Sequence, residues 1–342
     1  MSWLEEARDA DSFPAIAAHA SLLYALVGEA PRAEYWSALA TGQHRDGALA
    51  DGSTIAGTLA YLRSIEARDG TAQMRLDARR AWAGLSPASP YRATMRHTEG
   101  LAWLLEGDLD RADDLFVEAV EAAEVSGAQP LAAMVLAERA GVAVERGDWP
   151  AAVSAVHLAT AIVVDGGYGS YWTSALVHAW AARTALHLGL RTEAIEHTRR
   201  ALALRPLLTY ALPVVSTQAL LATGQACLGL GDLHAAAAVV RQAQEILHRR
   251  PGLGDLPERA AALGALVRDA AAHGRPGTLT PAEVRLLPLL ATHLTFPLIA
   301  ERLGVSRNTV KSQAISMYRK LGVSSRSEAV ALWEQLDGST GS

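Results

Sequence analysis

The chain of 342 residues is long enough for two domains with a sizeable core, and its Ala- and Leu-rich composition favours stacked helices over sheet. The single cysteine, Cys227, excludes an internal disulfide framework and is typical of a reducing cytoplasm, where we expect the protein. A net charge of −5 does not by itself indicate a nucleic-acid partner, and the acidic N-terminus lacks the basic-then-apolar order of a signal peptide.

Glycines recur along most of the chain at separations of 42, 37, 40, 42 and 42 residues. A fixed period in the range of about 20–50 residues is the signature of a solenoid. Glycine ends the first helix of a hairpin because it adopts the left-handed conformation without strain, and small alanines at fixed distances after it let the second helix pack closely. The pattern predicts helical hairpins stacked into a superhelix over residues 1–270, with a concave inner surface. The glycines are Gly28, Gly70, Gly107, Gly147, Gly189 and Gly231.

These hairpins resemble tetratricopeptide repeats, clearly in the last four copies and loosely in the first two. The Gly70 copy has Arg75 where a small residue is expected. The same register places Cys227 at a core position and assigns the uncharged stretch Leu207–Leu230 to a repeat rather than to a membrane span. No histidine pair has metal-ligand spacing, and the loop "DGGYGS" (165–170) has no lysine after it. We therefore expect no catalytic residue, no cofactor and no metal site.

After a linker containing Gly and Pro at 271–279, four short helices are expected over residues 280–338. "TPAE" opens the first helix with a capping box that joins Thr280 to Glu283, and this helix should run to about Leu294. "FPLIAERL" is the second helix, and Gly304 ends it in a tight turn. Ser306 then caps a third helix that ends at Leu321. Two helices joined by such a turn form a helix-turn-helix.

The third helix separates two kinds of side chain when it is projected at 100° per residue. Val310, Ala314 and Met317, flanked by Tyr318 and Leu321, face the core. The outer face and flanks carry cations, hydrogen-bonding groups and one exposed aliphatic residue, and both lysines of the chain belong to this helix. A helix in a major groove would use cations for phosphates, polar groups for base edges and Ile315 for a thymine methyl group. The expected DNA contacts are Arg307, Asn308, Lys311, Ser312, Ile315, Arg319 and, on the backbone alone, Lys320.

Local charge supports this interpretation. Residues 275–342 hold eight Lys or Arg against five Asp or Glu, which gives a net charge of +3, so residues 1–274 hold 23 against 31 and carry −8. A basic element attached to an acidic body is typical of a small nucleic-acid-binding domain.

The elements "LT.AE", "IAERLGVS", "TVK", "KLGV" and "SRSEAV" resemble the LuxR-type helix-turn-helix domain of bacterial transcription regulators. The resemblance implies that the helix with "TVK" lies in the major groove, which adds Thr309 to the expected contacts. It also implies that the fourth helix forms a dimer through Ala329, Leu332, Trp333 and Leu336. Pro297 and Leu298 replace a polar pair usual in that family, and Gln313 stands where relatives often have His. These departures leave the fine sequence preference open.

Repeats followed by this domain resemble the C-terminal half of the large ATP-dependent LuxR-type regulators. Their P-loop ATPase part is missing, because no lysine precedes Lys311, so the chain is either a natural short form or a fragment. The expected function is a DNA-binding transcription regulator. Its expected partners are double-stranded DNA, a second copy on the DNA, RNA polymerase and a peptide, protein or small-molecule effector on the repeats. Alternatives are an interaction scaffold with a vestigial DNA-binding domain and an enzyme with a fused DNA-binding domain.

Overall fold

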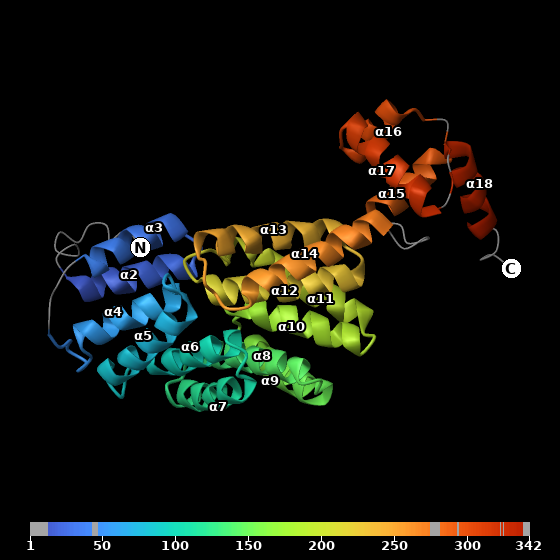
Figure 1. The fold of residues 1–342 in the computed structure, drawn as a ribbon. Coiled ribbons are helices and arrows are strands. Elements are labelled where there is room, and N and C mark those ends of the chain that lie inside the picture. Colours follow the sequence, from blue (N-terminus) through green and yellow to red (C-terminus); the bar gives the residue numbers. More distant parts are fainter. Residues whose placement is uncertain are drawn as a thin grey trace. The chain divides into compact units, whose positions relative to one another are not determined.

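The computed structural model describes residues 13–42, 47–273, 281–292, 294–321, 323 and 325–337. Throughout these residues the regular elements are helices, so the predicted all-α fold is confirmed (Figure 1). Internal contacts divide the chain into two compact units. The repeat unit comprises Met1–Leu230 and His234–Ala265, and the C-terminal unit comprises Gly231–Leu233 and Leu266–Ser342.

Within the described residues, six helical hairpins follow one another, as the glycine period predicts (Figure 1). Each predicted glycine lies at the turn between two helices with a φ between +76° and +88°, the region in which a side chain would be strained. A short 3₁₀ helix, η2 (Arg205–Leu207), precedes the sixth hairpin, and α14 (Leu256–His273) follows it. The hairpins pair α2 (Pro14–Leu26) with α3 (Ala30–Thr41), α4 (Ile55–Glu66) with α5 (Gly70–Gly84), α6 (Arg92–Leu105) with α7 (Leu109–Val125), α8 (Gln129–Glu145) with α9 (Trp149–Asp165), α10 (Ser174–His187) with α11 (Arg191–Ala203), and α12 (Pro213–Leu230) with α13 (Leu233–Arg249).

Small residues fill the seams of the hairpins, as predicted. The alanines five residues after the last four glycines are fully buried, and Cys227 is a buried core residue. Arg75 occupies the corresponding position of the second hairpin without disrupting it. Its guanidinium carbon lies 4.0 Å from the ring centroid of Trp103, and it forms an ion pair with Glu106. A large residue is accommodated here because it reaches across to the next hairpin.

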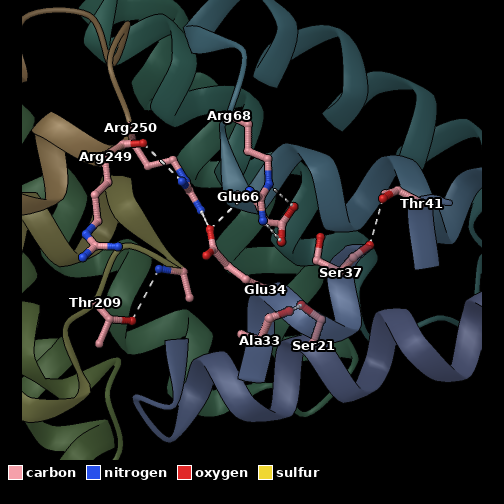
Figure 2. Close-up of polar contacts among 11 residues, drawn as sticks. Ser21, Ala33, Glu34, Ser37, Thr41, Glu66, Arg68, Thr209, Arg249 and Arg250 are labelled. Atoms are coloured by element: carbon pink, nitrogen blue, oxygen red, sulfur yellow. Dashed lines mark hydrogen bonds and ion pairs between the residues drawn. The ribbon is translucent and has the colours of Figure 1, made fainter. Parts of the chain in front are cut away.

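The repeat unit closes on itself, which the sequence does not predict. Glu34 in α3 accepts hydrogen bonds from Arg250, after α13, at 2.6 Å and from Arg68 at 3.3 Å (Figure 2). Burial opposes the charge on Glu34, but the two arginines outweigh it and hold the pKa of this carboxyl below its usual value. The backbone joins too, because Thr71 donates its N–H to the carbonyl of Gly252 at 3.2 Å. The first two hairpins therefore contact the segment that follows the sixth.

A second close approach seals the same ring. Gly28 lies against the 3₁₀ helix η2, and a Cβ atom at this position would lie 2.6 Å from the carbonyl oxygen of Pro206. Its φ of +81° also requires glycine. The first hairpin turn is thus fixed against the chain that enters the sixth hairpin.

The uncharged stretch before Gly231 forms α12, whose Ser216 and Thr217 are buried within the repeat unit. Across the described part of the chain, none of the helices combines the length and the apolar character that crossing a membrane requires. The same residues contain no group of three or more His, Cys, Asp or Glu side chains placed to hold a metal ion.

Beyond α14, the described part of the C-terminal unit contains four helices: α15 (Pro281–Leu290), α16 (Phe296–Leu303), α17 (Arg307–Leu321) and α18 (Arg326–Asp337). Leucines of α15, Ile299 of α16 and Met317 of α17 form its buried core. The linker prediction overlaps a helix, because α14 continues to His273. Thr280, the predicted cap of the first helix, lies outside the described residues. The domain boundaries remain a prediction.

The first of these helices ends at Leu290, four residues earlier than expected. Arg326 of α18 donates hydrogen bonds to the carbonyl oxygens of Leu290 at 2.8 Å, Thr292 at 2.6 Å and Leu294 at 2.8 Å. Pro288 has no N–H to donate within the helix, which weakens its last turn. The guanidinium therefore binds carbonyl groups at and just beyond the end of α15.

Candidate nucleic-acid interface

The turn between α16 and α17 has the predicted geometry. Gly304 has a φ of +66° and ends α16, while the Oγ of Ser306 accepts the backbone N–H of Thr309 at 3.1 Å. The hydroxyl groups of Ser306 and Thr309 are also 2.7 Å apart. This capping fixes the direction in which α17 leaves the turn, because it satisfies a backbone donor that the first turn of a helix leaves free.

The inner face of α17 is buried as the helical projection predicts. Val310, Ala314 and Met317 have exposed fractions of 0%, 1% and 0%, and they pack against leucines of α15 and Ile299 of α16. Tyr318 and Leu321 are partly buried at the edge of this cluster. The packing fixes which side of α17 faces away from the core.

The outer face is exposed and chemically mixed. Arg307, Asn308, Lys311, Ser312 and Ile315 are all exposed, and Ile315 retains 57% of its accessible surface. The Ser312 hydroxyl donates to the carbonyl of Thr309 at 2.9 Å, within the same helix. Thr309 itself is half-buried and engaged in the cap. The side chain of Arg319 lies outside the part of the chain that the structure describes.

Three cations near this turn have no described partner. Neither Arg307 nor Lys311 makes a hydrogen bond or ion pair to any described residue, and the same is true of Arg302 in the last turn of α16. The expected DNA contacts do not include Arg302, although its position two residues before the glycine of the tight turn indicates that it lies beside the interface. Exposed cations without partners remain available for an anionic ligand such as a phosphate.

Lys320 differs from the expectation. Its Nζ lies 2.7 Å from the Oε2 of Glu283 in α15, and the two side chains are only 10% and 4% exposed. The ion pair joins the end of α17 to the start of α15 within the core of the unit. Lys320 therefore has a structural partner and is not a free cation on a flank, and we omit it from the proposed DNA contacts.

The predicted dimer face also changes. Ala329 is fully buried within the single chain, so its side chain has no surface to offer a second copy. Val330, its neighbour in α18, packs against the core of the unit. The side chains of Leu332, Trp333 and Leu336 lie outside the described residues, and their role at a dimer interface remains a prediction.

Comparison with known proteins identifies this region. Residues 277–333 match the family model of bacterial regulatory proteins, luxR family. They form a LuxR-family helix-turn-helix domain. The chain is 53% identical over 55 residues to the Probable transcriptional regulatory protein SgaR of Hyphomicrobium methylovorum, covering 16% of this chain and 26% of the relative. It is 50% identical over 54 residues to the Transcriptional regulatory protein YdfI of Bacillus subtilis (strain 168), covering 16% and 25%. The chain thus spans about a quarter of the length of these curated relatives.

Proposed function

We propose that this protein is a transcription regulator that binds double-stranded DNA through α17 in the major groove. The observation that carries the proposal is the outer face of α17, where unpaired cations and hydrogen-bonding groups surround the exposed Ile315. An exposed isoleucine among cations has no role in the fold, but it can contact the methyl group of a thymine. The names of the two relatives, both described as transcriptional regulatory proteins, support the same class.

The proposed contacts have different tasks. Asn308, Lys311, Ser312 and Ile315 would meet base edges, because they lie on the side of α17 opposite its buried face. Arg302 and Arg307 would meet phosphates beside the turn. Thr309 would act mainly by holding the cap, and Arg319 remains a proposed phosphate contact.

The assembly is also a proposal. A second copy would dock through Leu332, Trp333 and Leu336 of α18, and the dimer would bind a two-fold operator and act on RNA polymerase. The hairpins would be tetratricopeptide-like repeats that sense an effector, as in the C-terminal half of the large ATP-dependent regulators. We expect no enzymatic activity and a cytoplasmic location.

The test is a DNA titration of the intact chain. Sites would first be selected from a random duplex library, and affinity would then be measured on a selected site and a scrambled duplex at several salt concentrations. Wild type should discriminate between them, and Ile315→Ala should reduce the discrimination by about 1–3 kcal/mol. Ile195→Ala is the matched control, because Ile195 is an equally exposed isoleucine of the repeat unit, at 52%. Equal losses on both duplexes for Ile315→Ala would exclude the proposed orientation, and absence of salt-dependent binding would exclude the function.

A further inference from the structure

The repeat unit contains a cavity of about 820 Å³ that is partly open to solvent. The first helices of five hairpins line it, namely α2, α4, α6, α8 and α12, together with the loop between α9 and α10. This size falls within the range of about 300–1,000 Å³ that is typical of small-molecule sites. The closing contacts of Glu34 and Gly28 hold the first hairpins in place, so the cavity is formed before any ligand binds.

The chemistry of the lining is strongly apolar. Leucine, methionine and aromatic side chains make up most of the wall, including Tyr61, Tyr91, Met134 and Trp172. Among the described residues that line it, none is Asp, Glu, Lys or Arg. A ligand charge placed in such a cavity would lose its hydration without gaining a partner, at a large free-energy cost. The lining therefore selects against nucleotides, phosphates and carboxylates.

Two buried polar groups in the wall have unused hydrogen-bonding capacity. His97 and Thr173 both line the cavity and are 2% and 8% exposed. Neither the Nε2 of His97 nor the Oγ1 of Thr173 has a hydrogen-bond partner in the described chain. The nearest acid to His97 is Glu138, whose Oε1 lies 3.9 Å from the Nε2, beyond hydrogen-bond distance. The Oε1 of Glu138 is itself buried without a partner, and neither the Nε2 of His97 nor the Oγ1 of Thr173 has surface open to the cavity, so these groups lie behind the wall and leave its inner surface apolar.

The wall suits a small molecule better than a peptide. A peptide brings an amide donor and a carbonyl acceptor at every residue, and each group that is buried without a partner is costly. The polar side chains of the wall are few, and His97, Thr98 and Thr173 are themselves buried. A mostly hydrocarbon molecule matches this lining.

We propose that the cavity is the binding site for an uncharged, predominantly apolar small molecule. The inference rests on the proposed function only in naming this molecule as the effector. Binding at the cavity can be measured without DNA, so the two proposals can fail separately.

The first experiment uses the uncharged fluorescent probe N-phenyl-1-naphthylamine on the full chain. We expect saturable binding with a dissociation constant in the micromolar range. Thr94→Trp places an indole in the cavity wall of α6 and should weaken probe binding roughly tenfold or more. Thr192→Trp is the matched control, because Thr192 is exposed near the start of α11 and is not part of the cavity wall. Equal binding by the two variants, or no saturable binding by wild type, would overturn the proposal.

The second experiment tests the ligand class by displacement of the probe. 1-Decanol should displace it, decanoate at neutral pH should be roughly tenfold weaker, and maltose should have no effect. Equal displacement by decanoate and 1-decanol would show that the uncharged class is wrong.

Discussion

The two units use their cations differently. In the repeat unit many arginines are consumed by internal ion pairs, such as Arg139 with Asp113 at 2.7 Å and Arg79 with Glu99 at 2.6 Å. In the C-terminal unit Arg302, Arg307 and Lys311 are exposed and have no described partner. Total charge therefore says less about an anionic ligand than the pairing state of each cation does. Lys311 and Lys320 make the point within one helix, because only the first remains free for a ligand.

The largest expected difference between a paired and an unpaired cation concerns the stability of variants at the two lysines. Lys320→Met removes the ammonium group that pairs with the buried Glu283 carboxylate and should destabilise the C-terminal unit by about 3–5 kcal/mol. Lys311→Met makes the same chemical change on the exposed face and should leave stability nearly unchanged. Hydrogen–deuterium exchange of the intact chain, followed in peptides from residues 281–337, separates the two outcomes.

A second substitution controls for the origin of this loss. Glu283→Gln removes the buried charge, so the double variant with Lys320→Met should recover at least half of the lost protection. If Lys320→Met instead kept full protection and lowered the salt dependence of DNA binding, Lys320 would be a phosphate contact and the contrast would fail.

The next prediction concerns the acid stability of the repeat unit, which contains a pair of neighbouring histidines. The Nδ1 atoms of His178 and His197 are 3.2 Å apart, and burial, with the neighbouring His197 and Arg200, lowers the pKa of His178 to about 4. Burial and Arg200 also lower the pKa of His197, although Glu193 and Glu196 oppose this. The unfolded chain therefore takes up protons first as the pH falls. Stability from His178 is complete above about pH 6.5 and should be lost progressively toward pH 4.

The size of this effect is up to about 3 kcal/mol for His178 alone. Urea unfolding at a series of pH values should show a shallower acid loss for His178→Gln than for wild type. His157→Gln, at an exposed histidine of α9, is the control and should follow wild type. Parallel pH curves for wild type and His178→Gln would show that the pair contributes no acid sensitivity.

Free cations in the two units should differ in their effect on DNA. Arg302→Ala should lower the slope of log affinity against log salt by about one and weaken binding to all sequences alike. Arg241→Ala removes an exposed arginine of the repeat unit and should leave the slope unchanged. Titrations on random duplex DNA suffice for this comparison. A similar decrease for both variants would mean that the cations near α17 have no special role.

The smallest effect concerns the start of α17. Ser306→Ala removes the acceptor for the Thr309 N–H and should destabilise the helix by about 1 kcal/mol. Ser325→Ala, at the Oγ that accepts the N–H of Glu328 before α18, provides a comparable cap in the same unit. Exchange rates in the first turn of each helix should rise separately. A rise at α18 after Ser306→Ala would indicate that the two helices unfold together.

Much of the fold was predictable because its signals are local. A glycine with a positive φ marks the turn of each hairpin, and in every hairpin but the second an alanine follows five residues later; the faces of α17 follow from a 100° projection. Ring closure was not predictable, because Glu34 and Arg250 are 216 positions apart and meet only after six hairpins have added their rotations. The partner of Lys320 was missed for a related reason. The sequence assigns Glu283 to a local capping box with Thr280, which lies outside the described residues, and gives no sign that the same carboxylate also pairs with a lysine 37 positions away.

Closure of the repeat unit also limits how its gene can evolve. An open solenoid gains or loses a hairpin by duplication or deletion, because each copy contacts only its neighbours. Here one extra copy would move Arg250 away from Glu34, and one missing copy would misplace the η2 segment that meets Gly28. The closing contacts therefore constrain the number of hairpins. Lineages of this protein should vary in the loops between hairpins while the number of hairpins stays at six.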